Sequence, residues 1–149
     1  MTSPLTLSFG SDHGGLALRR ALIEALKAKG LVILDRGTET EASCDYPDYA
    51  HAVAADVVGG RAKFGILVCT TGIGISIAAN KVRGIRAALV QSADAAGLSR
   101  RHNDANVLCF GAKYVDLPTA LACVDAFLAA EFEAGRHTRR VDKMESSCG

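Results

Sequence analysis

The feature that most constrains the fold is a regular alternation of short apolar runs with longer segments of helical periodicity. Five runs have the length of β-strands, at 5–9, 31–35, 64–69, 85–90 and 106–110. Strands that alternate with helices predict a parallel sheet joined by right-handed crossovers. We therefore expect an α/β fold: one doubly wound, Rossmann-like domain over residues 1–149, with a five-stranded parallel sheet, helices on both faces and a C-terminal helical tail.

The helical segments are marked by apolar spacing and by residues that start or stop helices. Leu18, Leu22 and Leu26 lie on one face of a predicted helix over 14–29, and Gly30 ends it. Pro47 suits the first turn of a helix that reaches residue 58. Further helices are predicted at 75–80, 92–102 and 117–132, with a partly helical tail over 133–143. Residues 36–46 are predicted to form a loop and residues 70–76 a Gly-rich turn.

Composition and charge exclude several classes of protein. Lys and Arg number 17 and Asp and Glu 16, a net charge of +1, so a generally basic nucleic-acid binder is not expected. The apolar runs are far below the ~20 residues that span a bilayer, and residues 1–10 do not resemble a signal peptide. We expect a cytoplasmic protein with no membrane and no nucleic-acid partner.

The cysteines and histidines give no support for a metal centre or a disulfide framework. The five cysteines are an odd number without a CxxC pair, and the four histidines are not spaced three or four residues apart. The prediction is therefore no metal and no cofactor.

Ligands of doubly wound folds bind beyond the carboxyl ends of the strands. The first such segment, Gly-Ser-Asp-His-Gly-Gly at 10–15, lacks both the Lys-Ser/Thr of a P-loop and the GxGxxG of a dinucleotide site. Asp12 is expected either to cap a helix or to serve a site, and His13 either to bind an anion or to donate a proton.

The second segment, Cys-Thr-Thr-Gly-Ile-Gly-Ile-Ser at 69–76, places a cysteine between a strand and a helix N-terminus. Backbone N–H groups at such a turn can bind an anion, and the helix dipole stabilises a thiolate. Cys69 is therefore a candidate base or nucleophile. The alternative is a buried cysteine that only fills space, which is the expectation for Cys109 and Cys123.

Two later segments offer acid–base and anion-binding groups. His102 and Asn103 end a predicted helix, where they serve either as cap and turn residues or as groups that act on a ligand. Arg136 and Arg140 share one helical face and either form an exposed basic surface or hold a phosphate.

These segments together resemble the type B ribose-5-phosphate isomerases and the wider family that includes galactose-6-phosphate isomerase subunits. The resemblance runs from about residue 7 to residue 141. It rests on five motifs in order: 10–15, Asp-Tyr-Pro-Asp-Tyr-Ala at 45–50, the segment 69–87, Ser-Arg-Arg-His-Asn-Asp-Ala-Asn-Val at 99–107, and Gly-Arg-His-Thr-Arg-Arg-Val at 135–141.

The resemblance implies an isomerase that interconverts ribose 5-phosphate and ribulose 5-phosphate through a cis-enediol, without metal or cofactor. Cys69 would be the base that moves a proton between C1 and C2, and His102, helped by Thr71, would open the sugar ring. Thr71 and the following backbone amides would bind the enediolate. The implied substrate-binding residues are Asp12, His13, Tyr46, Gly72, Ile73, Gly74, Ser76, Asn103, Arg136 and Arg140.

Within that set, the resemblance implies that Asp12 and Tyr46 hold sugar hydroxyls and that Asn103 contacts the sugar near the reacting carbons. His13, Arg136 and Arg140 would hold the phosphate. The family works as dimers or tetramers with each site shared between subunits, so a homodimer or tetramer is expected here.

Two positions bear on specificity. The family usually has glycine where Thr70 stands, so the preferred sugar phosphate stays open between a five-carbon substrate and four-carbon or six-carbon ones. Some members use a glutamate at the position of Ile75 in place of the cysteine, and this chain belongs with the cysteine users. From other classes, a non-catalytic phosphosugar-binding module and a cysteine hydrolase that pairs Cys69 with His102 remain as alternatives.

Overall fold

A five-stranded parallel sheet forms the centre of the computed structural model, which describes residues 3–146; Cys148 lies outside that range. Its strands are β1 (Thr6–Ser11), β2 (Val32–Asp35), β3 (Phe64–Cys69), β4 (Ala87–Leu89) and β5 (Val107–Gly111). Their order is β2-β1-β3-β5-β4, and every neighbouring pair is parallel. The predicted doubly wound α/β fold is therefore confirmed.

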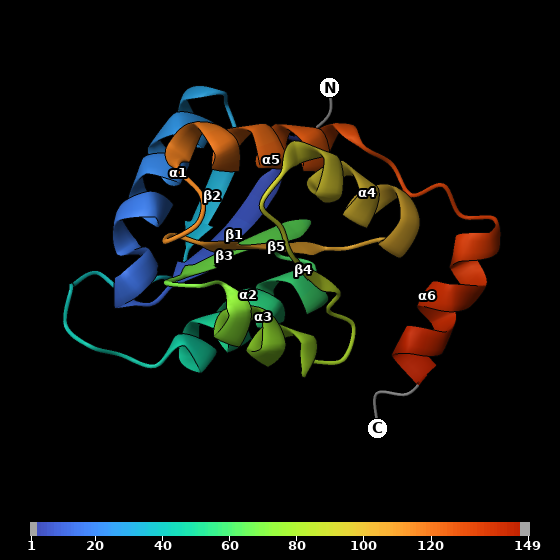
Figure 1. The fold of residues 1–149 in the computed structure, drawn as a ribbon, viewed down its shortest axis with the longest axis horizontal. Helices are drawn as coiled ribbons and strands as arrows, with labels where there is room; N and C mark the ends of the chain where they lie inside the picture. The colour runs from blue at the N-terminus through green and yellow to red at the C-terminus, as the bar shows by residue number, and fades with distance from the viewer. Residues whose placement is uncertain (1–2, 147–149) are drawn as a thin grey trace.

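Helices cover both faces of this sheet. The short 3₁₀ helix η1 (His13–Gly15) leads into α1 (Leu16–Ala28), which packs on one face with α4 (Ala93–Asn103) and α5 (Leu117–Ala129). The other face carries α2 (Tyr46–Val58) and α3 (Ile73–Asn80) (Figure 1). The larger of the two apolar cores contains Phe9, Phe110 and Phe127, and the smaller contains Leu67 and Ile75. β3 is buried along its whole length because it faces both cores.

The elements that lead to the sheet edge begin where the sequence provides local signals. Asp12 caps η1 through its side chain, and Ser92 caps α4 by accepting a hydrogen bond from the Ala95 N–H at 3.2 Å. Pro47 lies in the first turn of α2, which begins one residue earlier than predicted, at Tyr46. α3 begins at Ile73, so the predicted turn over 70–76 is confined to residues before that helix.

The chain after α5 differs from the prediction. The helix expected to reach residue 132 ends at Ala129, because Ala130 is extended, with φ −88° and ψ 152°. The Glu133 N–H then donates to the Arg101 carbonyl at 3.0 Å, and Ala134 and Gly135 turn the chain through positive φ values. The tail beyond forms the helix α6 (Arg136–Ser146).

α6 stands apart from the sheet, beside α4 (Figure 1). Its buried residues are His137 and Val141, while Arg136 and Arg140 are exposed. Near its end, Glu145 Oε1 forms an ion pair with Arg86 Nη1 at 2.6 Å. Across residues 3–146, none of the helices has the length and apolarity needed to cross a bilayer.

Candidate active site

A cleft of about 410 Å³ opens at the carboxyl ends of β1 and β3. The connections that leave these neighbouring strands go to opposite faces of the sheet, which is where doubly wound folds bind ligands. The residues that line the cleft are Asp12, Tyr46, Cys69, Thr70, Thr71, Ile73 and Gly74.

Cys69 is the last residue of β3, and only 5% of it is exposed. Its Sγ accepts a hydrogen bond from the Gly72 N–H at 3.1 Å. Gly72 has a φ of +78°, and a Cβ there would lie 2.5 Å from Leu89 Cδ1 and 2.8 Å from the Gly111 nitrogen. Only glycine therefore allows this turn, and the turn directs an N–H group at the sulfur.

The start of α3 provides further donors beside the sulfur. The first N–H groups of a helix have no intrahelical acceptor, and the helix dipole makes this end positive. The Thr71 hydroxyl accepts one of them, from Ile73 N at 3.2 Å. Ser76 lies one turn further along and donates to the Ile73 carbonyl at 2.8 Å, so its hydroxyl is engaged within the helix.

Asp12 and Tyr46 line the same cleft as Cys69. Asp12 is buried, and its Oδ1 accepts the Gly15 N–H at 3.2 Å, so the predicted cap is confirmed and the residue also lines the cleft. The Tyr46 ring packs directly on Gly74, where a Cβ would lie 2.5 Å from the ring carbon Cζ. Glycine at 74 therefore lets the aromatic ring lie against the first turn of α3.

His13 has a fixed tautomer when it is neutral. Its Nδ1 accepts the Cys44 N–H at 3.3 Å, so the ring proton lies on Nε2, which is then a donor. The loop that carries Cys44 is itself tied down by Arg19, only 1% exposed, whose Nη1 donates to Ser11 Oγ at 2.5 Å and Nη2 to the Thr38 carbonyl at 2.6 Å. A buried guanidinium thus connects the end of β1 to the loop beside His13.

A second group of predicted site residues lies on α4 and α6. The rings of His102 and His137 stack with centroids 4.4 Å apart, and Glu133 Oε1 lies 3.7 Å from His102 Nε2. Burial lowers the pKa of His137, and His102, Arg136 and Arg140 lower it further. His137 is therefore biased toward its neutral form.

The side chains of His102, Glu133 and His137 could also be considered as metal ligands, because their ligand atoms lie within 4.8 Å of one another. The two ring planes, however, are inclined by only 14° and are stacked. A metal ion binds in the plane of an imidazole ring, and one ion cannot lie in two stacked planes. This geometry fits a stacked pair and not a metal centre.

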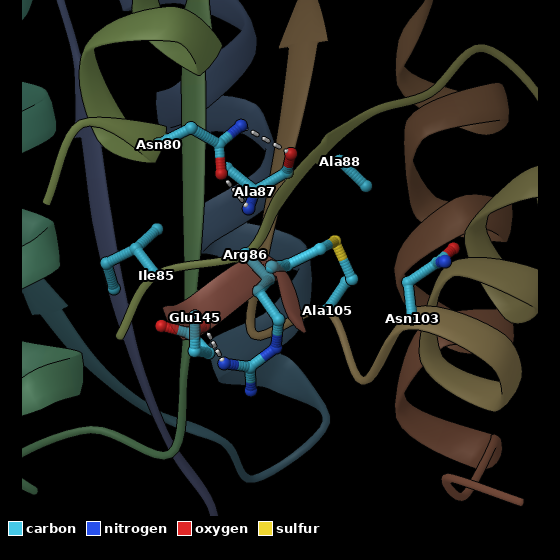
Figure 2. A pocket seen from close by; sticks show the side chains of 9 residues that line it. Asn80, Ile85, Arg86, Ala87, Ala88, Asn103, Ala105 and Glu145 are labelled. Carbon is cyan, nitrogen blue, oxygen red and sulfur yellow. Dashed lines mark hydrogen bonds and ion pairs between the residues drawn. The ribbon is translucent and has the colours of Figure 1, made fainter. Parts of the chain in front are cut away.

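Asn103 lines a different cavity, of about 340 Å³, between β4, α4 and α6. Figure 2 shows Asn103 on one side of it and Asn80 and Arg86 on the other. The Asn80 amide pairs with both backbone groups of Ala87, at 2.8 and 2.9 Å, and thereby covers part of the edge strand.

The structure thus divides the predicted site residues into two groups. Asp12, Tyr46, Cys69, Thr71, Ile73 and Gly74 line one cleft, and Gly72 and Ser76 are hydrogen-bonded to its residues Cys69 and Ile73. His13 follows Asp12 in the chain, but its hydrogen bond goes to Cys44, which does not line the cleft. His102, Asn103, Arg136 and Arg140 lie on α4 and α6, and the lining of the Cys69 cleft contains no residue of either helix within the described part of the chain.

A comparison with known proteins identifies a family that spans most of this chain. The family model described as Ribose/Galactose Isomerase matches residues 7–144. This chain belongs to the Ribose/Galactose Isomerase family. Ribose-5-phosphate isomerase B of Escherichia coli strain K12 is 48% identical over 138 residues, which cover 93% of each chain.

Solved structures of Ribose/Galactose Isomerase relatives agree in fold. That of Clostridium thermocellum ribose-5-phosphate isomerase B has a TM-score of 0.94 and 48% identity, covering 95% of this chain and 96% of the other. That of ribose-5-phosphate isomerase B from Mycoplasma genitalium, determined with bound ribulose-5-phosphate, has a TM-score of 0.91 and 44% identity and covers 97% of each chain.

Some residues that contact the predicted site residues were not predicted from the sequence. Glu133 and His137 are the neighbours of His102, and Cys44 is the partner of His13. Glu133 and His137 are four residues apart, but the turn at Ala134 and Gly135 separates them, so helical spacing gave no signal. Cys44 lies in a polar loop, where no periodicity predicts a contact.

Proposed function

We propose that this chain interconverts ribose 5-phosphate and ribulose 5-phosphate through a cis-enediolate intermediate. The observation that carries the proposal is the Cys69 thiol at the carboxyl end of β3, held by the Gly72 N–H in a cleft that also exposes Asp12 and Tyr46. The family, and relatives named as ribose-5-phosphate isomerase B, support the choice of substrate.

The reaction needs one group that moves a proton between two carbons. In this proposal the Cys69 thiolate takes the proton from C2 of the open-chain aldose, and the C1 carbonyl oxygen becomes the enediolate oxygen. The same proton, or one exchanged with solvent, is returned to C1. The hydrogen on O2 leaves as the C2 carbonyl forms, and O1 is protonated. The product is the ketose. These steps are general acid–base catalysis, and the sugar phosphate undergoes no net oxidation.

Negative charge develops on oxygen during this step, and the start of α3 lies where it can be stabilised. The N–H groups of the first helical turn and the Thr71 hydroxyl border the same cleft as Cys69. Fixed donors of this kind act most strongly in a site that excludes water.

The rest of the cleft has groups suited to holding the sugar. The Asp12 carboxylate and the Tyr46 hydroxyl are available for sugar hydroxyls, and the Nε2–H of neutral His13 can donate to a phosphate oxygen. Binding at the phosphate positions C1 and C2 against the thiol, which is how a remote group contributes to rate.

The residues on α4 and α6 enter the proposal through a second copy of the chain. His102 for ring opening, Asn103 near the reacting carbons, and Arg136 and Arg140 for the phosphate would come from the partner subunit. In the family-like homodimer or tetramer, a two-fold contact would build two equivalent sites.

An apolar surface next to the cleft suits such a contact. Ile73 and Ile77 lie one turn apart on α3 with about half of each side chain exposed, 51% and 55%, and Leu89 on the edge strand is 37% exposed. Burying side chains of this kind stabilises subunit contacts.

The alternatives differ in what they require. The same chemistry on a four-carbon or six-carbon sugar phosphate would use the same residues. A non-catalytic phosphosugar-binding module would not need the Cys69–Gly72 contact. A cysteine hydrolase would need a histidine held against Cys69, and the described residues of one chain that line the cleft include no histidine, so this alternative too would need His102 from a second copy.

The test is an NMR assay of the purified chain in D₂O with four-, five- and six-carbon sugar phosphates. The proposal predicts ribulose 5-phosphate formation from ribose 5-phosphate, with deuterium incorporated at the carbon that receives the proton. Isomerisation only of another sugar phosphate would replace the substrate and keep the mechanism. Binding of sugar phosphates without isomerisation or exchange would establish the binding module and overturn the proposal.

A further inference from the structure

Thr70 lines the cleft with a hydroxyl that the hydrogen bonds of the described residues do not use. Its main chain is fixed, because its carbonyl accepts the Lys113 N–H at 3.0 Å and the carbonyl of Cys69 accepts the Ala112 N–H at 2.9 Å. Its side chain is exposed and lines the cleft, and its hydroxyl makes no hydrogen bond within residues 3–146. The neighbouring threonine, Thr71, is the one that accepts an N–H at the start of α3. Capping therefore does not explain Thr70.

The Thr70 hydroxyl lies against Gly14, which belongs to the short helix η1 after β1. A Cβ at Gly14 would come 2.1 Å from Thr70 Oγ1 and 3.3 Å from the Thr70 nitrogen. A threonine at 70 in this orientation therefore requires that residue 14 have no side chain. The two residues form a complementary pair that joins the loop after β3 to the turn after β1.

Each member of this pair directly follows a residue of the proposed site in the sequence. Cys69, the proposed base, directly precedes Thr70, and His13, the proposed phosphate donor, directly precedes Gly14. Because Thr70 lines the same cleft as Cys69, a substrate bound at the thiol lies beside the Thr70 side chain. An additional CHOH unit would have to be accommodated in this cleft, next to the methyl and hydroxyl groups of Thr70.

We propose that Thr70, with the space left by Gly14, determines which chain length the site accepts, admitting five-carbon sugar phosphates and disfavouring six-carbon ones. This inference rests on the proposed isomerase function. One side chain can have an effect of this kind, because a misfit of one carbon in a pocket changes kcat/KM by roughly 10-fold to 200-fold.

The direct experiment compares Thr70→Gly with wild type on ribose 5-phosphate and allose 6-phosphate. The ratio of kcat/KM, six-carbon over five-carbon, should rise by about 10-fold or more in Thr70→Gly. Thr70→Val is the matched control, because it keeps the branched volume and removes the hydroxyl, and its ratio should stay within about 3-fold of wild type if volume decides. Thr70→Ser removes only the methyl group, and its kcat/KM ratio should lie between those of Thr70→Gly and Thr70→Val. If Thr70→Gly does not fold, Thr70→Ser takes its place in the comparison.

The contact between Thr70 and Gly14 allows a second, independent test of the proposal. Gly14→Ala should lower kcat/KM for ribose 5-phosphate by about 10-fold, because the new methyl group displaces the Thr70 hydroxyl into the cleft. In the double variant Gly14→Ala/Thr70→Gly, most of that loss should disappear, since residues in contact have non-additive effects. Equal losses in both backgrounds would show that the two residues do not act as a pair and would overturn the proposal.

The outcomes separate this inference from the proposed function. If wild type isomerises ribose 5-phosphate but the six-carbon to five-carbon ratio is the same in wild type, Thr70→Gly and Thr70→Ser, the specificity proposal is wrong and the isomerase proposal stands. If wild type turns over none of the sugar phosphates, the isomerase proposal is wrong. Calorimetric Kd values for five-carbon and six-carbon sugar-acid phosphates then test the same ratio as a binding preference, and an unchanged ratio overturns it.

Discussion

The Cys69 cleft and the α4–α6 surface both hold residues of the predicted site, but they are built in different ways. Around the cleft, the side chains lie at strand ends or helix starts, and Cys69 is only 5% exposed, with its sulfur accepting the Gly72 N–H. On α6, by contrast, Arg136 and Arg140 are exposed, and this helix is attached to the rest of the chain through His137 and Val141 and through the pair of Glu145 with Arg86.

The difference matches the two tasks in the proposal. Proton transfer between adjacent carbons needs atoms placed within a few tenths of an ångström, and a sheet edge provides that rigidity. A phosphate anchor needs charge and forked donors more than a rigid sheet, and a helix that stands apart from its own sheet can present them to another copy. The comparison therefore predicts distinct kinetic effects for variants in the two regions.

The largest effect is expected in the cleft. Cys69→Ala should lower kcat by about 10²- to 10⁴-fold, the usual contribution of a general base, while the Kd for sugar phosphate changes little. Steady-state kinetics and calorimetry measure the two quantities. The matched control is Cys123→Ala, a buried cysteine of α5 outside the cleft, which should keep wild-type kcat. Near-normal turnover by Cys69→Ala would mean that another group moves the proton.

A smaller effect, of a different kind, is expected on α6. Arg140→Ala should raise KM for ribose 5-phosphate by about 10-fold to 100-fold with little change in kcat, because it removes a charged hydrogen bond made throughout the reaction. Arg139→Ala removes the same charge from the adjacent position and should leave KM near wild type. If the two variants behave alike, Arg140 contributes only to the general field of the helix.

The smallest effect concerns how firmly α6 is held. Since burial lowers the pKa of His137 from its ordinary value of 6.5, the stability this residue contributes is complete above that pH. It declines as the pH falls through 6.5 toward the lowered value, because the opened segment binds the proton more readily. Amide hydrogen exchange over residues 136–146, corrected for intrinsic rates, should be a few-fold faster at pH 5.5 than at pH 7.5, roughly the population change expected for one shifted histidine.

The strands β1 and β3 serve as the internal reference for that exchange measurement, and their protection should not change over the same pH range. In His137→Gln the pH dependence in α6 should be absent. Equal protection of α6 at both pH values in wild type would show that the neutral histidine does not hold this helix.

The sequence predicted the fold well because each local signal agreed with the sheet. The expected strand at 64–69 matches β3 residue for residue, since both of its faces are buried. The expected strand at 85–90 was too long. The Ile85 N–H donates to the Val82 carbonyl and the Arg86 N–H to the Asn106 side chain, so neither N–H group donates to a strand carbonyl. Turn and side-chain partners of this kind are not visible in an apolar pattern.

The site was predictable only in part, and for a related reason. Asp12 and Cys69 follow neighbouring parallel strands, so strand alternation alone places them at one edge. No periodicity indicates that Thr70 would meet Gly14, or that the rings of His102 and His137 would stack. The placement of His102, Arg136 and Arg140 outside the cleft of their own chain is likewise a matter of how surfaces meet, which helical spacing does not encode.

The most direct test of the central claim, that the cleft of one subunit uses the arginines of another, is complementation between two damaged chains. Cys69→Ala and the double variant Arg136→Ala/Arg140→Ala are refolded separately and together in equal amounts, and ribose 5-phosphate isomerisation is measured well below the KM of the arginine variant. With random pairing, half of the dimers are mixed and each mixed dimer has one intact site, so about a quarter of wild-type activity should return. If the mixed dimers form, as shown by mass spectrometry, and the mixture remains as inactive as its parents, the site lies within one subunit and the account is wrong.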